Sequence, residues 1–200
     1  MLTQEQCQGT VNISDVFGAA IWSVDYILYG AGLKVSRMHL HMGTPYRYSA
    51  WQPITINGTA PNARPLYYGN MFTSTALAGG DKQVVSVLNE TSLTAYAIYS
   101  AKHSPATLES LAVVNLEQYN MTQSASARPY TAFKFPAHLG GWSRAKVRRL
   151  TAPGTDARTN VTFAGQYVDD TGCIVGELDI ERVHNGQVLV AAGEAVLVSL

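Results

Sequence analysis

The sequence contains little charge, and that charge is balanced. Of its 200 residues, 14 are lysine or arginine and 14 are aspartate or glutamate, so the formal net charge is zero. Proteins that bind nucleic acids carry a basic stripe or patch. The one dense basic cluster here, residues 144–149, is better explained as a strand with exposed charges. No nucleic-acid partner is therefore predicted, and a hydrophobic content of 46% indicates a folded core rather than disorder.

Cysteine is also scarce. Cys7 and Cys173 form at most one bridge, which excludes a disulfide-stapled framework, and both a single bridge and two buried thiols remain possible. No metal-ligand spacing occurs in the sequence. His39 and His41 share one face of a predicted strand but have no further ligands nearby. The sequence predicts no metal site and no cofactor.

Long hydrophobic runs are absent as well. The longest apolar stretch, residues 16–29, is shorter than the ~20 residues that span a bilayer, and it contains Asp25. We therefore predict a buried helix and no membrane partner. The first residues, MLTQEQCQG, lack the basic start and apolar centre of a secretory signal.

Glycosylation sequons, in contrast, are frequent. The pattern Asn-x-Ser/Thr occurs at five of the nine asparagines: Asn12, Asn57, Asn89, Asn120 and Asn160. Random occurrence explains one or two such sites, whereas a secreted eukaryotic glycoprotein accumulates them. The missing signal is reconciled with secretion if these residues are the C-terminal part of a longer precursor with its signal upstream.

The most informative stretch is residues 14–53. Ser14 and Asp15 are good N-cap residues for the apolar helix, and Gly30 and Gly32 are expected to end it. Trp22 and Tyr26 are predicted to lie in the core. The run from residue 34 to 41 roughly alternates and predicts a strand, which leads into a tyrosine-rich loop. Helix, strand and then a polar loop at the strand's end is the order found in a (β/α) barrel.

The rest of the sequence has a different pattern, in which one helical segment is followed by short β-rich runs. A helix is predicted over residues 66–77, and Gly79-Gly80-Asp81 marks the expected domain boundary. Beyond it, short β-rich runs bounded by turn residues recur at 84–88, 93–99, 108–116, 130–135, 145–150, 161–167, 174–183 and 188–200. This spacing predicts an antiparallel β-sandwich. The fold class is thus α+β and mostly β, with residues 1–80 as the last elements of an incomplete (β/α)8 barrel and residues 81–200 as the sandwich.

Several motifs occur in an order that resembles a known family. They are Cys7-x-Gly9, Ser14–Trp22, Asp25-Tyr26, His41–Pro53, Tyr67–Gly69, Ala95–Tyr99, Val114–Leu116, Val147–Pro153 and Glu194–Leu200. In this order the chain resembles the C-terminal part of fungal β-glucuronidase-like enzymes of glycoside hydrolase family 79, which includes heparanase. The resemblance implies a catalytic barrel followed by an antiparallel sandwich, and so agrees with the division above.

The catalytic mechanism of the family needs two neighbouring carboxylates, and this sequence contains no convincing pair. Retaining glycosidases use an acid/base and a nucleophile about 5 Å apart. The resemblance places the nucleophilic glutamate at or just before Met1. Glu5 is the nearest acidic residue, but a four-residue shift along a strand displaces it by more than ~10 Å. Glu5 is kept only as a weak candidate, and no catalytic residue is assigned. The other glutamates are expected to be surface charges of the sandwich: Glu90, Glu109, Glu117, Glu177, Glu181 and Glu194.

The tyrosine loop is the candidate binding surface. In the family, the loop after the last barrel strand binds the sugar's carboxylate through a backbone amide and a tyrosine. The resemblance carries that role to Gly43 and to Tyr46 or Tyr48, and Trp51 offers a stacking face. The structural alternative is that these aromatic side chains only pack the barrel against the sandwich.

Two functions follow from these observations. The first is a C-terminal fragment of a secreted β-glucuronidase-like glycosidase, inactive alone, whose full-length parent binds a uronic-acid-containing glycoside. The alternative is a non-catalytic carbohydrate-binding or interaction module. Whether the chain itself is an enzyme stays open, because the catalytic pair is missing.

Overall fold

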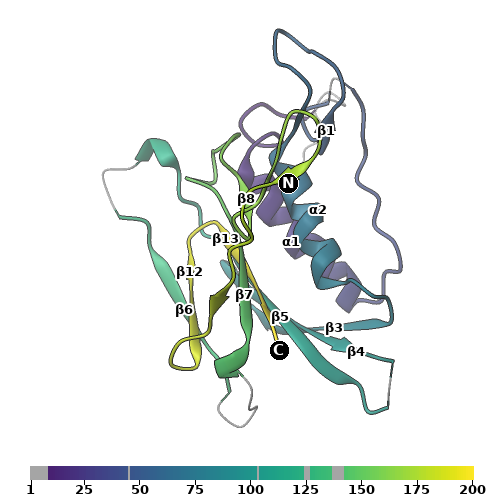
Figure 1. The fold of residues 1–200 in the computed structure, drawn as a ribbon, viewed down its shortest axis with the longest axis vertical. Helices are drawn as coiled ribbons and strands as arrows, with labels where there is room; N and C mark the ends of the chain where they lie inside the picture. Colours follow the sequence, from purple (N-terminus) through teal and green to yellow (C-terminus); the bar gives the residue numbers. More distant parts are fainter. Residues whose placement is uncertain (1–8, 45, 103, 124–126, 137–141) are drawn as a thin grey trace.

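The computed structural model describes residues 9–44, 46–102, 104–123, 127–136 and 142–200. A helical N-terminal part is followed by a strand-rich remainder (Figure 1). The helices are α1 (Phe17–Gly32) and α2 (Pro65–Ala76), and short 3-10 turns span Met121–Gln123 and Trp142–Arg144. The strands are β1 (Trp51–Gln52), β2 (Asn62–Ala63), β3 (Lys82–Asn89), β4 (Leu93–Ser100), β5 (Thr107–Asn115), β6 (Tyr130–Lys134), β7 (Lys146–Thr151), β8 (Thr162–Phe163), β9 (Tyr167–Val168), β10 (Ile174–Val175), β11 (Glu181–Arg182), β12 (Gln187–Ala191) and β13 (Glu194–Ser199). Neither α1 nor α2 is long and apolar enough to cross a bilayer, and no other helix of the described residues is.

One large sheet organises the molecule. Its strand order is β11–β7–β13–β5–β4–β3, all neighbours are antiparallel, and β8 pairs with β7. The strand built from the last residues, β13, lies inside the sheet. Its Val196 is opposite Val113 of β5 on one side and Arg149 of β7 on the other. The remaining strands form the two-stranded sheets β12–β6, β1–β2 and β10–β9.

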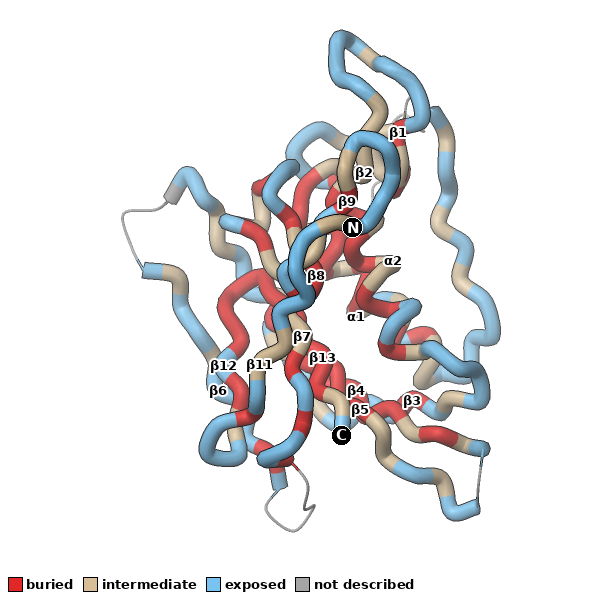
Figure 2. The backbone as a smooth tube through the Cα atoms, in the orientation of Figure 1, coloured by how far each residue is buried: buried red, intermediate tan, exposed pale blue. Residues whose placement is uncertain are grey.

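Both faces of the large sheet are covered, so its central strands are buried with little interruption. Alternate side chains of these strands point to opposite sides. One set, which includes Ile98, Val114 and Leu197, packs with α1 and α2. The other set, which includes Val113 and Val196, packs with β6 and β12 (Figures 1 and 2). The prediction of a mostly β fold with antiparallel sheets is confirmed, and the two covering layers are a helix pair and a strand pair.

Helix α1 begins differently from the sequence prediction. Its N-cap is Val16, which makes no side-chain capping bond. Ser14 Oγ instead accepts a hydrogen bond from the Thr10 amide at 3.0 Å, and Asp15 Oδ1 accepts one from the Asn12 amide at 2.8 Å. The first helical amides donate to carbonyls of a distant segment, with Phe17 N–Ala157 O and Gly18 N–Thr155 O both 2.8 Å. The predicted side-chain cap is therefore wrong, because backbone from the β-rich part takes its place.

The glycines of α1 and α2 allow close packing. Gly30 and Gly32 lie in the last turn of α1, and the helix ends at Gly32, as predicted. A Cβ on Gly30 would lie 2.6 Å from Met38 Sδ, so this glycine lets the following segment fold back onto α1. A Cβ on Gly69 of α2 would lie 2.3 Å from Ser23 Oγ and 2.8 Å from the Ala20 carbonyl oxygen. Gly69 thus sets how closely the two helices approach.

Asp25 connects α1 to the sheet. Its Oδ1 accepts hydrogen bonds from Thr94 Oγ1 and from the Tyr96 hydroxyl of β4, both at 2.6 Å. Tyr96 is buried, and burial raises the pKa of its hydroxyl above the ordinary value, with the Asp25 hydrogen bond adding to the shift. The polar break in the apolar helix is therefore a structural contact between α1 and β4.

The predicted strand over residues 34–41 does not form. The segment is without strand pairing among the described residues, and most of it is exposed along the outside of the molecule (Figure 2). A strand is stabilised by hydrogen bonds to a neighbouring strand. The described residues provide no such neighbour here, so alternation alone does not produce a strand.

Three predicted runs are broken by turns. Residues 161–167 divide into β8 and β9 around Ala164 and Gly165, which both have positive φ, at 51° and 77°. Residues 174–183 contain β10 and β11 separated by irregular chain. Residues 188–200 form the two strands β12 and β13, which reverse at Gly193, where φ is 64°. In each case the predicted run contains two strands that pair with different partners.

Two charged groups that were expected at the surface are partly or fully buried. Arg149 belongs to the basic cluster, yet its side chain is only 23% exposed, and that of Glu194 is 6% exposed. Arg149 binds Glu181 through two nitrogens at 2.6 and 2.9 Å, and it binds Glu194 at 2.9 Å. The surface prediction for Glu194 is wrong because the partner arginine comes from the neighbouring strand β7.

Candidate functional site

Aromatic side chains cluster in the tyrosine loop, which we define as residues 42–48. The rings of His41, Tyr46 and Tyr48 pack against one another with centroid distances of 5.2, 5.3 and 5.8 Å. His41 Nδ1 lies 2.8 Å from the Tyr48 hydroxyl oxygen, within hydrogen-bond distance. The loop therefore presents two tyrosine hydroxyls and an imidazole in one small area. His41, which directly precedes the loop, takes part in this cluster.

Gly43 forms the base of the cluster. A Cβ at this position would lie 2.1 Å from ring atoms of Tyr46, so only glycine lets that ring rest on the backbone. The Gly43 amide donates to Ser49 Oγ at 3.0 Å, and the Ser49 hydroxyl donates back to the Gly43 carbonyl at 2.7 Å. The structure thus brings Gly43, Tyr46 and Tyr48 together. It also shows that the Gly43 amide already has an internal partner.

Arginines hold the loop in place. Arg64 donates through Nη1 to the Tyr46 carbonyl and through Nη2 to Gln52 Oε1 at 2.6 Å. Burial lowers the pKa of Arg64, Asp15 opposes that shift, and the positive charge of Arg47 adds to it. Arg47 Nη1 donates to the Gly9 carbonyl at 3.3 Å. Arg64 therefore fixes the tyrosine loop from the β1–β2 side, and Arg47, a residue of the loop, ties it to Gly9.

A wide groove lies next to the loop. Its cavity volume is about 990 Å³, and its walls come from the loop, the β1–β2 hairpin, the start of α2 and residues 158–162 with β9. Its charged lining residues are Arg47, Arg64, Arg158, Asp15 and Asp170. Sequence analysis did not find this groove. Arg47 lay within the recognised loop, but no spacing rule connects it to Arg158, more than a hundred positions later.

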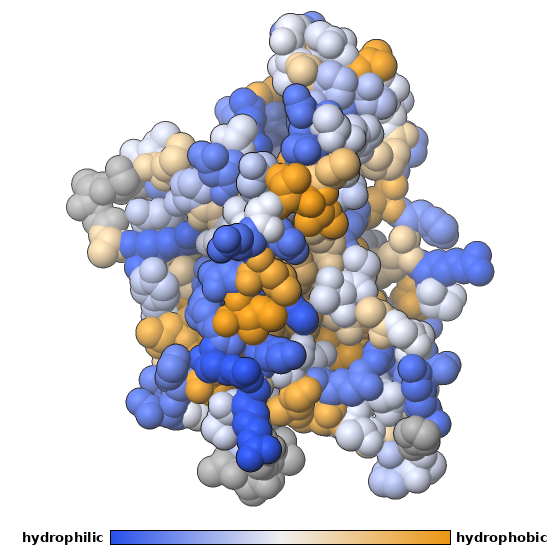
Figure 3. All heavy atoms as spheres, in the orientation of Figure 1, coloured by the Kyte–Doolittle hydropathy of each residue, from blue (hydrophilic) through white to orange (hydrophobic). Residues whose placement is uncertain are grey.

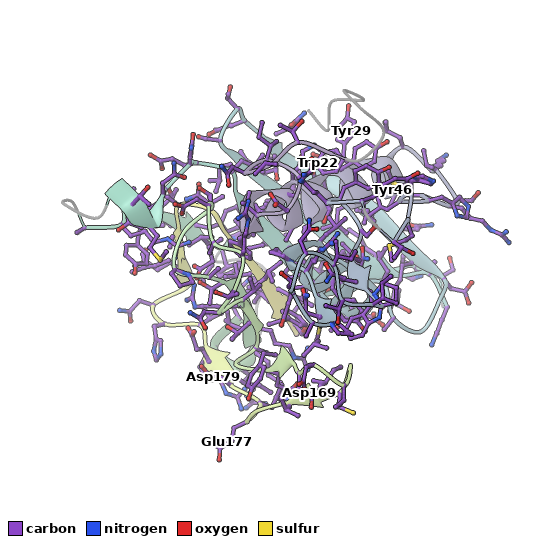
Figure 4. The ribbon with its side chains drawn as sticks, turned by 90° about the horizontal axis from the view of Figure 1, so that it is seen from above. Trp22, Tyr29, Tyr46, Asp169, Glu177 and Asp179 are labelled. Atoms are coloured by element: carbon purple, nitrogen blue, oxygen red, sulfur yellow. The ribbon has the colours of Figure 1, made fainter. Side chains whose placement is uncertain are left out.

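The acidic candidates do not assemble near the tyrosine loop. Glu5 lies outside the described residues. Figure 4 shows Tyr46 on the same side of the molecule as Trp22 and Tyr29, and the acidic Asp169, Glu177 and Asp179 on another side. Glu181 and Glu194 share Arg149, as described above. Within the described ranges, no group of His, Cys, Asp and Glu is arranged to hold a metal ion.

An aromatic stripe runs along the outer side of α1. Trp22 and Tyr26 stack with centroids 4.8 Å apart, and Tyr26, Tyr29 and Leu33 are 46%, 43% and 63% exposed. These four positions follow the helical repeat. The prediction that Tyr26 lies in the core is wrong for the described chain. On the face shown in Figure 3, hydrophobic side chains gather in separate patches between hydrophilic ones.

The sequons lie at accessible positions. Asn12, Asn57, Asn89 and Asn160 are exposed, and Asn120 is half-buried. Asn120 Oδ1 accepts a hydrogen bond from Thr155 Oγ1 at 2.9 Å. Asn57 and Asn160 also line the groove. A glycan is too large to bury, so this exposure is compatible with modification, and glycosylation itself remains a prediction.

Comparison with known proteins now gives the family. Residues 95–197 match the Glycosyl hydrolase family 79 C-terminal beta domain. The chain belongs to this family. The match begins in β4 and ends in β13, so it includes the central strands of the large sheet. The resemblance on which the sequence analysis relied is therefore confirmed.

Relatives extend the similarity beyond the family 79 β domain. The β-glucuronidases of Neurospora crassa and Aspergillus niger are 35% identical over 186 residues and 36% identical over 170 residues. Each alignment covers 79% of this chain but only 33% and 30% of the relative, so the chain spans about a third of their length. The crystal structure of a 4-O-α-L-rhamnosyl-β-D-glucuronidase from Fusarium oxysporum 12S, in a Rha-GlcA complex, matches with a TM-score of 0.75 and 25% identity. That match covers 94% of this chain and 40% of the other.

Proposed function

We propose that this family 79 chain acts as the C-terminal part of a β-glucuronidase-like glycosidase. The observation that carries the proposal is the structural match of 94% of the chain to 40% of a glucuronidase that was crystallised with Rha-GlcA. That coverage includes the helical N-terminal part as well as the β domain. In this proposal the chain supplies the tyrosine loop and the accessory β domain, and the catalytic glutamates belong to another part of the polypeptide.

The tyrosine loop is the proposed sugar-binding element. The Tyr48 hydroxyl lies beside the His41 imidazole, and the Tyr46 ring rests on Gly43, an arrangement that suits a carboxylate or sugar hydroxyls. For the Gly43 amide to bind a carboxylate, Ser49 Oγ has to give up its present hydrogen bond. The Tyr48 hydroxyl likewise lies within hydrogen-bond distance of His41 Nδ1, so a bound sugar has to replace or extend that contact as well.

The aromatic stripe on α1 supports the same proposal. Trp22, Tyr26, Tyr29 and Leu33 leave apolar surface exposed on a helix whose opposite side is fully buried. Large exposed apolar surfaces mark interaction sites. We infer that the missing elements of a (β/α)8 barrel cover this stripe in the longer polypeptide, which keeps residues 1–80 and 81–200 as the proposed domains.

The first test concerns activity. We expect the purified 200-residue chain not to hydrolyse an aryl β-glucuronide, because the described residues contain no suitable carboxylate pair. Turnover that disappears in the Glu5→Gln variant would contradict this and make Glu5 a catalytic group. Specific, saturable sugar binding by a chain with no barrel partner would favour the alternative of a carbohydrate-binding module.

The second test concerns the loop. In the longer polypeptide, Tyr46→Phe or Tyr48→Phe should lower kcat/KM on an aryl β-glucuronide by roughly ten- to a hundredfold, the effect of losing a hydrogen bond to a charged group of about 1.5–3 kcal/mol. The matching glucoside lacks the carboxylate and should lose much less. Tyr130→Phe is the control, since Tyr130 is exposed on β6. Equal losses on both substrates would make the loop tyrosines packing residues.

A further inference from the structure

The groove beside the tyrosine loop combines size with an uncommon charge arrangement. At about 990 Å³ it is at the upper end of the ~300–1,000 Å³ typical of small-molecule sites, so it has room for more than one sugar ring. Three guanidinium groups line it, from Arg47, Arg64 and Arg158. They come from the tyrosine loop, from the residue before α2 and from the segment before β8. These segments are separate in the sequence, and the three arginines line one cavity only in the folded chain.

These arginines are positioned but only partly neutralised. Arg158 donates to Asp15 Oδ2 at 2.9 Å and to Asn12 Oδ1 at 2.8 Å. Within the part of the chain that the structure describes, Arg64 and Arg47 donate to uncharged groups, namely two backbone carbonyls and one amide side chain. A guanidinium has five N–H donors, so each arginine keeps donors beyond these bonds. Burial and the nearby Arg47 both disfavour the charge of Arg64, the carboxylate of Asp15 opposes them in part, and a bound anion would add to the stabilisation that Asp15 provides.

The rest of the lining is suited to a sugar. Gln52, Asn62 and Thr159 provide neutral donors and acceptors, and Pro61 and the half-exposed Tyr167 provide apolar faces. Carbohydrate sites combine hydroxyl-binding polar groups with such faces. Asp15 and Asp170 disfavour a densely charged anion, because they repel additional negative charge. Isolated carboxylates separated by hydroxyl-rich rings match this distribution better.

We propose that this groove binds an acidic saccharide, with Arg47, Arg64 and Arg158 receiving its carboxylate groups. It would hold a part of the saccharide beyond the ring taken by the tyrosine loop, because Arg47 lies in that loop while Arg158 comes from the separate segment before β8. The proposal rests on the proposed function only for its ligand class. Binding in the groove requires no catalytic group.

The experiment measures binding by the chain itself, without turnover. The chain is produced in bacteria, so that no glycan at Asn57 or Asn160 obstructs the groove. Calorimetric titration uses the tetramer of α-1,4-linked galacturonic acid and, separately, its fully methyl-esterified form. We expect the acid to bind at least tenfold more tightly than the ester. We also expect added NaCl to weaken the binding of the acid but not the binding of the ester.

Variants then locate the site. Arg47→Gln and Arg158→Gln should each weaken binding of the acid by roughly tenfold or more, and Arg158→Lys should retain part of the affinity. Arg37→Gln is the control, because it removes the same charge from an exposed position outside the groove. Thermal unfolding of each variant confirms that it is folded.

Three outcomes would overturn the proposal: no saturable binding at millimolar acid, equal affinity for acid and ester, or equal effects of Arg37→Gln and the groove variants. The last outcome would mean that binding follows net charge only. Failure here is separable from failure of the proposed function, which is judged by turnover in the longer polypeptide and by the loop tyrosines.

Discussion

Arg149 joins three strands through one guanidinium. It comes from β7, binds Glu181 of β11 and Glu194 of β13, and donates to the Leu189 carbonyl of β12 at 2.8 Å. Glu194 Oε2 also accepts the Ala191 amide at 2.9 Å, across the turn between β12 and β13. One partly buried arginine therefore ties the large sheet to the strand pair that covers it.

We expect Arg149→Met to destabilise the fold strongly. The carboxylate of Glu194 would stay buried without its cation, a change that costs about 3–5 kcal/mol. Urea unfolding followed by circular dichroism measures the loss. Arg148→Met, at the adjacent position of β7, is the matched control and should cost much less. The double variant Arg149→Met/Glu194→Met should regain stability, and a loss as large as that of the single variant would refute the argument.

Tyr96 predicts a specific pH dependence. The pKa of its hydroxyl is raised in the folded state above the value of about 10 for a free tyrosine. The unfolded chain therefore releases this proton at lower pH than the folded chain, so stability is complete below about pH 10 and falls as pH rises above it. Unfolding midpoints measured from pH 8 to 11 should show this fall, and Tyr96→Phe should reduce its slope. Tyr130→Phe, which removes the hydroxyl of an exposed tyrosine, is the matched control variant.

Some contacts of individual residues could be predicted from the sequence, and others could not. The grouping of Gly43, Tyr46 and Tyr48 could be expected because they are neighbours in sequence. Ser14 and Asp15 do not cap α1, because the backbone carbonyls of residues 155 and 157 accept the hydrogen bonds of its first amides. The three groove arginines had no sequence signature at all, since each lies in a different segment. Local chemistry is visible in the sequence, and contacts between distant segments are not.

At the scale of elements, the contact between α1 and α2 depends on Gly69. We expect Gly69→Ala to cost roughly 1–3 kcal/mol, because the added methyl would meet both a side chain and the Ala20 carbonyl. Thermal unfolding should show a lower midpoint. Gly32→Ala is the control, since its methyl would meet only the Val84 carbonyl oxygen, at an ordinary 3.7 Å. A similar loss in both variants would show that helix–helix distance is not the cause.

Helices and strands were predictable to different degrees. The helices expected over residues 16–29 and 66–77 formed close to those limits, because an apolar segment with flanking breakers specifies a helix locally. Strands β3 to β7 also formed close to their predicted positions. The run over residues 34–41 failed because a strand depends on a neighbour. Turns at Ala164 and Gly193 divided two further runs that hydrophobicity alone had joined.

At the scale of the whole molecule, the segment after α1 should be the most easily cleaved part of the isolated chain. Lys34 and Arg37 are exposed and lie outside any helix or strand. Brief trypsin treatment, followed by mass spectrometry, should therefore detect the first cuts after these residues, while β4 and β13 remain intact. In the longer polypeptide the same sites should be protected. Cleavage at equal rates in both forms would contradict the inferred covering of this side.

The position of β13 has a consequence for the order of folding. Residues 194–199 lie between β5 and β7, so the halves of the large sheet meet only through the last strand of the described chain. During synthesis, β3, β4 and β5 can pair as they emerge, whereas β7 has to wait for β13 before it can join them. Such long-range pairing makes folding slow. A ribosome-bound chain that ends before residue 194 should therefore stay sensitive to protease, with hydrophobic strand surface available to chaperones until residues 194–199 leave the exit tunnel.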